Sequence, residues 1–279
     1  MKQQKSLKQI LFLSACSLVG FTGCGPALEQ RLLFAPTRSV CETPETYGLE
    51  TKTLELKAED GTGLHAWLLE TNEDAPWLIH FHGNHSNITM NLRLPVRLQE
   101  RLGFNVLMAE YRGYYNSVGR PSEEGFYQDA KAYYDYLIGR GVAPENIIVY
   151  GFSLGSGTAT QLASTQRVGG LILQAPFSSI LDVARERVNP ELPASLLQTK
   201  FDNRAKIKNV KAPVLIIHGT NDETVPFEQG EALFGLANEP KDFLSYEGDH
   251  NTLNRQPETQ LTIVFEDLVN QIEHMLQTM

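Results

Sequence analysis

Short apolar runs alternate with helix-like stretches along most of this chain, and this alternation constrains the fold more than any other feature. The runs predicted as strands are Thr51–Leu56, Leu64–Leu69, Trp77–Phe81, Asn105–Ala109, Asn146–Tyr150, Gly170–Gln174, Pro213–His218 and Lys241–Tyr246. Helical patterns lie near Asn87–Arg101, Glu123–Arg140, Leu154–Ser164, Pro226–Leu236 and Glu258–Gln277. Most of the strands are near-continuously apolar, as buried parallel strands are. We therefore expect an α/β protein with a mostly parallel sheet of about eight strands and helices on both faces.

One segment departs from this alternation of strands and helices. Residues 177–210 are too many for a simple helical crossover, and Pro190 and Pro193 follow a helical stretch at Ser179–Val188. Two interpretations stay open: a small cap over a site, or one ordinary helix followed by a surface loop. In both cases residues 51–279 form a single domain.

The N-terminus has the pattern of an export signal. Lys2, Lys5 and Lys8 precede a mostly apolar or small stretch over residues 10–23, with no acidic residue among them. A membrane-spanning helix needs about 20 apolar residues, so this stretch has the length of a signal peptide rather than of a span. We expect residues 1–23 to be a signal peptide, although an uncleaved N-terminal anchor is an alternative.

The end of that stretch resembles a bacterial lipobox, in which small residues precede a cysteine that receives a diacylglycerol. Residues 21–24 end in Cys24, and cleavage before it uses the whole apolar stretch. Cys16 is the alternative, because residues 13–16 fit the lipobox consensus better but leave a short apolar core. A lipidated, palmitate-bearing Cys24 predicts a lipoprotein anchored to a membrane of the bacterial cell envelope. Residues 24–50 would then be the anchor and linker.

The lipobox resemblance also bears on location. A lipidated chain would face the periplasm or the exterior. Gly25, rather than an aspartate, follows Cys24, which favours the outer membrane.

The amino-acid composition limits which class of protein this chain can belong to. Of the 279 residues 42% are hydrophobic and 20% are charged, which suffices for one full core. Three cysteines are too few to stabilise a domain of this size by disulfide bonds. Cys41 has no histidine-rich neighbourhood of the kind that a catalytic cysteine needs. The formal charge of −9 disfavours nucleic acid as a partner. We expect a monomer.

A candidate nucleophile lies where a strand meets a helix. Gly151-Phe152-Ser153-Leu154-Gly155 has the form G-x-S-x-G and follows the predicted strand Asn146–Tyr150. A sharp strand-to-helix turn leaves room only for small residues two before and two after the serine. It exposes the serine hydroxyl and places the Leu154 amide at a helix N-terminus, where the dipole favours negative charge. Ser153 is therefore the predicted nucleophile.

Two later loops supply the partners that a serine nucleophile needs. Asp222 is the first carboxylate after the strand Pro213–His218, with Glu223 as its close rival. His250 follows the last predicted strand in a Gly-containing loop. The order Ser, acid, His is that of a nucleophile-elbow enzyme, in which the acid orients the histidine that takes the serine proton. We predict the triad Ser153, Asp222 and His250.

The loop after the third predicted strand is the expected source of the second oxyanion donor. It begins His82-Gly83-Asn84, and a glycine allows close backbone approach. We predict that the backbone amides of Asn84 and Leu154 form the oxyanion hole. His80, His82 and His85 have no acidic residue among them, so no metal is expected. No organic cofactor is implied.

These motifs together resemble the BEM46-like serine hydrolases of the α/β-hydrolase superfamily, the group that includes α/β-hydrolase domain-containing proteins 12, 13 and 17. The resemblance runs from about Leu32 to the last helix. It rests on Leu33–Pro36, His82–Asn84, Tyr111–Tyr114, Gly151–Gly155, Ala212–Gly219 with Asp222, and His250-Asn251. It implies the α/β-hydrolase fold, with a small or absent cap, and the triad above.

Three residues depart from the pattern of that group. Glu110 stands where it usually has aspartate, Tyr115 where it usually has glycine, and Asp249 precedes His250 in place of a small residue. None of these changes removes a catalytic group. The bulk of Tyr115 raises the question of whether the loop beside the oxyanion site keeps its geometry.

The function expected from the sequence is hydrolysis of acyl esters or thioesters through an acyl-enzyme intermediate. The expected substrate is a small-molecule or lipid acyl compound, and lipid anchoring would place enzyme and membrane lipid at one surface. A serine peptidase of the prolyl-oligopeptidase type shares the triad order but usually carries a large extra domain, for which this chain has no room. A non-catalytic relative of the fold is the other alternative.

Overall fold

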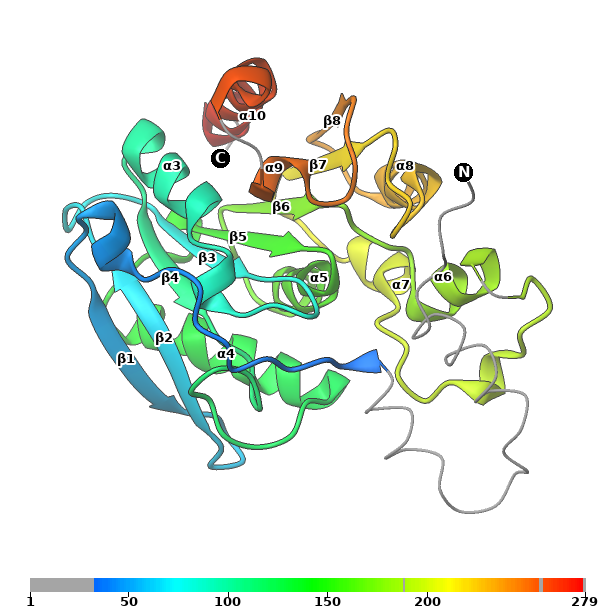
Figure 1. Cartoon of the computed structure of the whole chain (residues 1–279), viewed down its shortest axis with the longest axis horizontal. Helices are drawn as coiled ribbons and strands as arrows, with labels where there is room; N and C mark the ends of the chain where they lie inside the picture. The colour runs from blue at the N-terminus through cyan, green and yellow to red at the C-terminus, as the bar shows by residue number, and fades with distance from the viewer. Residues whose placement is uncertain (1–32, 188, 256–257, 278–279) are drawn as a thin grey trace.

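A computed structural model describes residues 33–187, 189–255 and 258–277. Its centre is one eight-stranded sheet in the order β1-β2-β4-β3-β5-β6-β7-β8 (Figure 1). The strands are β1 (Lys52–Lys57), β2 (Gly63–Leu69), β3 (Trp77–Phe81), β4 (Asn105–Ala109), β5 (Ile147–Phe152), β6 (Gly170–Gln174), β7 (Val214–Gly219) and β8 (Lys241–Tyr246). All eight predicted strands are present.

The sheet is mostly parallel, as predicted. β1 and β2 form an antiparallel hairpin, and β2 is also antiparallel to β4. Every other pair, from β4–β3 to β7–β8, is parallel. The carboxyl ends of β3, β5, β6, β7 and β8 therefore lie along one edge of the sheet, where ligand sites of open α/β sheets form.

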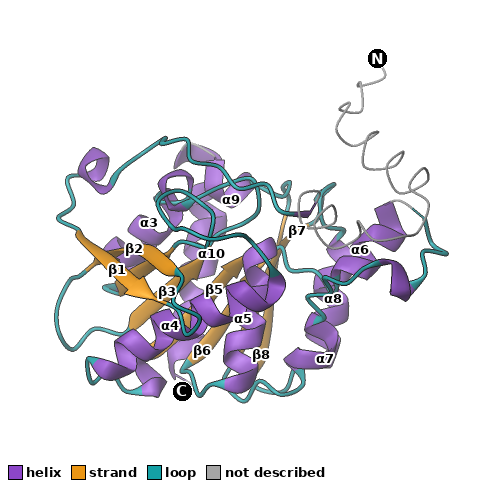
Figure 2. Ribbon diagram, turned by 90° about the horizontal axis from the view of Figure 1, so that it is seen from below, coloured by secondary structure: helices purple, strands orange, loops and turns teal. Residues whose placement is uncertain are grey.

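Helices cover both faces of the sheet (Figure 2). One face carries α4 (Glu123–Gly139), α5 (Leu154–Thr165), α7 (Asn203–Ile207) and α8 (Phe227–Leu236), and the other carries α3 (Arg93–Leu102) and α10 (Glu258–Gln277). Adjacent residues of β3 pack into different hydrophobic cores. Ile79 packs in the core with α4 and α5, and Leu78 packs in the core with α3 and α10. This follows from the alternation of side chains along a strand.

The helix predicted over Asn87–Arg101 is in fact two elements. A single 3₁₀ turn, η2 (Ile88–Met90), precedes α3, and the Asn87 side chain caps it by accepting the Thr89 amide. The Thr89 carbonyl accepts the Glu42 amide at 3.1 Å instead of continuing a helical ladder. The prediction of one continuous helix was wrong, because η2 ends at Met90 and α3 begins at Arg93.

The described part of the predicted linker packs against the domain. Phe34 is only 3% exposed, and its ring meets those of Phe126 and Phe201 edge-on. A 3₁₀ turn, η1 (Pro44–Tyr47), follows along this segment. Phe34 is thus part of the core rather than of a free tether.

The segment 177–210 contains α6 (Ile180–Arg187), η4 (Ala194–Leu196) and α7, and lies to the side of the sheet in Figure 1. The predicted signal peptide and both candidate lipidation sites, Cys16 and Cys24, lie outside the described residues. Within the described ranges, no helix has the length and apolar character needed to cross a membrane.

Candidate active site

Ser153 occupies a strained turn between β5 and α5. Its φ of +52° and ψ of −116° are sparsely populated for a residue with a side chain. A Cβ on Gly155 would lie 2.2 Å from the Phe81 carbonyl oxygen, and one on Gly151 would lie 2.5 Å from the Gly155 carbonyl oxygen. Both glycines of the motif are therefore required by crowding, and the turn holds the Ser153 hydroxyl out from the sheet edge.

The three side chains predicted as a triad form one hydrogen-bonded series. His250 Nε2 lies 2.9 Å from Ser153 Oγ, and His250 Nδ1 lies 2.6 Å from Asp222 Oδ2. Ser153 follows β5, Asp222 follows β7 and His250 follows β8, so the parallel sheet brings together residues 97 positions apart in sequence. This is the arrangement in which a histidine accepts a serine proton while a carboxylate fixes its tautomer.

Asp222 is surrounded by hydrogen-bond donors. Its Oδ1 accepts the amides of Thr224 at 2.7 Å and Val225 at 2.8 Å. Burial raises the pKa of Asp222, but hydrogen bonds from His218 and His250 outweigh it and hold that pKa well below its usual range. Glu223, the rival in the sequence, is exposed. Geometry thus selects Asp222 as the partner of His250.

His218 is a second histidine at this carboxylate and lies inside β7. Its Nε2 is 3.4 Å from Asp222 Oδ2 and 3.1 Å from the Val225 carbonyl oxygen. A carbonyl oxygen only accepts, so Nε2 carries the proton. The sequence signal available for this contact is the four-residue spacing from His218 to Asp222.

The two predicted oxyanion donors lie on the cleft beside Ser153. Leu154 is the first residue of α5, and the first four amides of a helix have no intrahelical acceptor. Gly83 and Asn84 line the same cleft as Ser153 and His250. A Cβ on Gly83 would lie 3.4 Å from Ser153 Cβ, so the loop after β3 passes close to the nucleophile.

The Asn84 side chain has a separate role. Its Oδ1 accepts the Ala35 amide at 3.0 Å and the Tyr114 hydroxyl at 2.9 Å, and its Nδ2 donates to the Leu33 carbonyl. Asn84 therefore ties the N-terminal segment to the loop that carries the candidate oxyanion amide. The sequence contained no signal for this contact.

Tyr115 does not intrude on the site. It adopts a φ of +40°, and its ring packs edge-on against His65 and Trp67. Its amide donates to the Thr37 carbonyl at 3.0 Å. The bulky residue is accommodated by turning away from the cleft, so it leaves the loop after β3 in place.

The three histidines around β3 have separate surroundings. His80 stacks on Tyr150 in the core, His82 pairs with Glu110, and His85 lines the cleft. Among the residues that the structure describes, no group of three or more His, Cys, Asp or Glu side chains is placed to hold a metal ion.

Ser153 opens into a cleft of about 590 Å³. Its apolar lining comes largely from the N-terminal segment and from residues 177–210, namely Leu33, Phe34, Phe177, Ile180, Val183 and Phe201. Its polar lining comes from the loops after β3 and β8 and from the short helix α9 (Thr252–Arg255), including Asn84, Ser86, Asn91, Asn251 and Asn254. Residues 177–210 thus wall the site as a small cap would. The contribution of Leu33 and Phe34 was not predicted.

Comparison with known proteins gives the same fold and relatives. The family model described as "alpha/beta hydrolase fold" matches residues 76–200. Protein YfhR of Salmonella typhi is 34% identical over 72% of this chain and 75% of its own length. Protein bem46 of Schizosaccharomyces pombe is 33% identical over 74% of this chain and 72% of its own. The Pyrococcus furiosus esterase Pf2001 superposes with a TM-score of 0.70 at 21% identity, covering 88% of this chain and 97% of that one.

The sheet order, the turn at Ser153 and these relatives define the class as α/β-hydrolases. Within that class, the chain belongs to the BEM46-like family.

Proposed function

We propose that this chain is a serine hydrolase that cleaves acyl esters or thioesters. The observation that carries the proposal is the unbroken series from Ser153 Oγ through His250 to Asp222, with 2.9 Å and 2.6 Å between its heavy atoms. These lengths lie within hydrogen-bond reach for a nucleophile and its general base. The strained turn at Ser153 keeps the hydroxyl accessible from the cleft.

In the acylation step, Ser153 Oγ attacks the substrate carbonyl carbon as His250 Nε2 takes the hydroxyl proton. Collapse of the tetrahedral intermediate breaks the bond to the leaving alcohol or thiol, which receives that proton from His250. Asp222 stays ionised and stabilises the imidazolium that forms. Water then attacks the acyl-serine by the same proton path, releasing the carboxylic acid and free Ser153.

The amides of Leu154 and Asn84 hold the oxyanion of each tetrahedral intermediate. Leu154 contributes a helix N-terminal amide, where the dipole adds to the hydrogen bond. Asn84 contributes from the opposite loop. The apolar side chains of the cleft would take the acyl chain, and the polar side chains of the loops after β3 and β8 would face the leaving group.

We further propose that the enzyme is a lipoprotein of the bacterial cell envelope, anchored through Cys24. Leu33 lines the cleft and lies nine residues after Cys24. A chain of that length spans at most about 30 Å, so the anchor would hold the cleft close to the bilayer. This geometry favours an acyl substrate drawn from, or bound to, the membrane.

The test of the hydrolase proposal is a panel of p-nitrophenyl esters, acyl thioesters and peptide amides. We expect ester or thioester turnover by the wild type, and loss of it in Ser153→Ala. Ser164→Ala is the matched control, because that serine sits at the far end of α5 and donates to the Gln161 carbonyl. Turnover of amides alone would favour a peptidase, and no turnover would favour a non-catalytic relative.

The anchor has its own test. Intact-mass measurement and palmitate labelling of cells expressing the full chain should show lipid on the wild type and none on Cys24→Ser. Lipid that persists in Cys24→Ser and disappears in Cys16→Ser would assign the anchor to the earlier site.

A further inference from the structure

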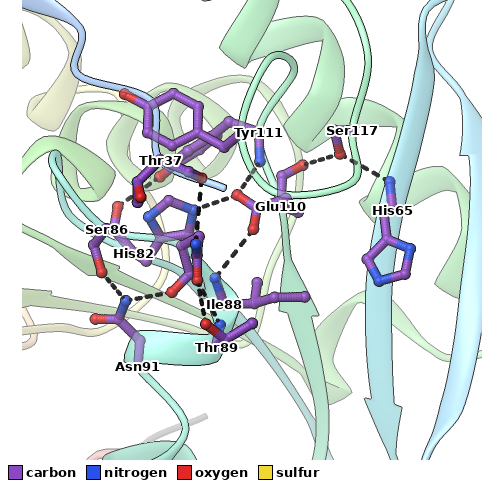
Figure 3. A network of polar contacts seen from close by, with 12 residues as sticks. Thr37, His65, His82, Ser86, Ile88, Thr89, Asn91, Glu110, Tyr111 and Ser117 are labelled. Atoms are coloured by element: carbon purple, nitrogen blue, oxygen red, sulfur yellow. Dashed lines mark hydrogen bonds and ion pairs between the residues drawn. The ribbon is translucent and has the colours of Figure 1, made fainter. Parts of the chain in front are cut away.

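His82 is completely buried at the start of the loop after β3, and both of its ring nitrogens face acceptors. Figure 3 shows its contact with Glu110. Nε2 lies 2.7 Å from Glu110 Oε1, and Nδ1 lies 2.8 Å from the Gly83 carbonyl oxygen. A carbonyl oxygen can only accept, so Nδ1 carries a proton that it donates to Gly83.

Glu110 is equally buried and sits at the end of β4. Its Oε1 accepts the Tyr111 amide and its Oε2 accepts the Ile88 amide, both at 3.1 Å. Backbone donors on both oxygens stabilise the ionised carboxylate. The Nε2 facing it therefore also carries a proton, which makes His82 an imidazolium and the contact a buried ion pair.

Two neighbouring groups define the surroundings of His82. His80 lies two residues earlier in the chain and is also buried; its burial, followed by its coulombic interaction with His82, lowers the pKa of His80 to about 3. The backbone of His82 is also fixed, because the Tyr111 hydroxyl donates to its carbonyl at 3.0 Å.

The carbonyl that His82 holds belongs to the same peptide unit as the Asn84 amide. That unit is trans, since the cis peptide bond among the described residues is Glu239–Pro240. In a planar trans peptide the C=O and the N–H point in opposite directions. His82 holds the carbonyl on the buried side, whereas Gly83 and Asn84 line the cleft on the other. The Asn84 N–H is thereby directed toward the cleft.

We infer that His82 and Glu110 are positioning residues of the oxyanion site, fixing and polarising the Gly83–Asn84 peptide so that its N–H binds the developing oxyanion. The inference rests on the proposed function. A charged donor on a peptide carbonyl strengthens the N–H of the same unit as a donor, because hydrogen bonds in series polarise one another. The pair never touches substrate and acts only through Asn84.

Two variants distinguish the orientation of the Gly83–Asn84 peptide from the effect of the positive charge on His82. His82→Leu removes the bond to Gly83, and we expect kcat on the ester to fall by about 10²-fold with KM within about threefold, the loss typical of one oxyanion donor. Glu110→Gln keeps the shape and leaves a neutral His82 whose Nδ1 still donates to Gly83. We expect a smaller fall in kcat, of about three- to tenfold.

The decisive readout is binding of a trifluoromethyl ketone, whose adduct with Ser153 carries an oxyanion. Its Ki should rise by the same factor as kcat/KM falls, a correlation that mere loosening of the fold would not produce. His65→Leu is the matched control, because His65 is a buried histidine on β2 whose ring contacts Glu55. It should keep both values within about twofold, and melting temperatures measured alongside identify any variant that fails to fold.

Failure of the proposed function can be distinguished from failure of the role proposed for His82 and Glu110. A wild type that turns over no acyl substrate would overturn the proposed function and this inference with it. An active wild type whose Glu110→Gln and His82→Leu variants fold and keep kcat and Ki overturns the inference alone. If His82→Leu does not fold, Glu110→Gln decides: unchanged kcat and Ki refute the pair's role, and a joint shift supports it.

Discussion

The carboxylate of Asp222 has a donor for nearly every lone-pair direction. Two backbone amides bind Oδ1, while His250 and His218 approach Oδ2. Such a carboxylate stays ionised and cannot rotate, so it presents one fixed acceptor to His250 Nδ1. The proposed base is thus held in the tautomer whose Nε2 is free to take the Ser153 proton.

We expect Asp222→Asn to lower kcat/KM on esters by about 10³- to 10⁴-fold, because the amide carries no charge and stabilises the wrong tautomer of His250. Glu223→Gln is the control, since it removes a neighbouring charge from an exposed side chain. It should stay within about twofold of the wild type. Equal losses in both variants, measured by steady-state kinetics, would contradict the role given to Asp222.

The sequence predicted these residues because each follows a predicted strand in the order Ser, acid, His. It did not predict the contacts of His218, His82 and Glu110, which depend on how these side chains are oriented in the folded chain. Glu110 was noted only as a departure from the usual aspartate. Nothing in a linear pattern says that its longer side chain reaches His82 and the Ile88 amide.

Among the elements, the strand–turn–helix unit of β5 and α5 is the most constrained. The Phe81 carbonyl lies where a Cβ on Gly155 would be. Gly155→Ala should therefore destabilise the fold by about 3 kcal/mol or more, since backbone must move. Gly235→Ala is the control, because a Cβ there meets nothing within 4 Å in helix α8. It should stabilise by up to about 1 kcal/mol, and urea unfolding of both variants measures the difference.

The short helix α6 belongs to the wall of the cleft. Ile180 and Val183 lie on it, are half-buried and line the site. Truncating both to alanine removes several buried methyl groups from the proposed acyl site, at about 0.8 kcal/mol each. We expect kcat/KM to fall about tenfold or more for an octanoyl ester and less than twofold for an acetyl ester. Equal losses on both esters would place the acyl chain elsewhere.

Element types and order were largely predictable, since apolar runs of four to six residues differ clearly from amphipathic stretches. The break between η2 and α3 was not predicted, and the Thr89 carbonyl there accepts the amide of Glu42, more than forty residues earlier in the chain. The same holds for Phe34, whose burial against Phe126 and Phe201 is a tertiary contact that local pattern does not encode.

For the whole molecule, the buried His80 makes stability depend on pH. Burial and the charge on His82 lower its pKa from 6.5 to about 3. Between those values the unfolded chain binds a proton that the folded chain does not, so the free energy of unfolding falls as the pH falls. From pH 7.5 to pH 5 this group removes about 2 kcal/mol.

His80→Phe should flatten that dependence. Phenylalanine can keep the stacking on Tyr150, and the Nδ1 of His80 has no hydrogen-bond partner to lose. Urea unfolding at pH 7.5, 6 and 5 should therefore show the variant losing about 2 kcal/mol less than the wild type over this range. Parallel pH curves for the two proteins would show that His80 does not stay neutral in the folded state.

If Ser153 is the nucleophile, a fluorophosphonate should react with it, and the site of that reaction can be measured directly. Intact mass and peptide mapping should find one adduct, on the peptide that contains Ser153, absent in Ser153→Ala and retained in Ser164→Ala. A wild type that never reacts, or a Ser153→Ala variant that still carries the adduct, would show that Ser153 is not the nucleophile.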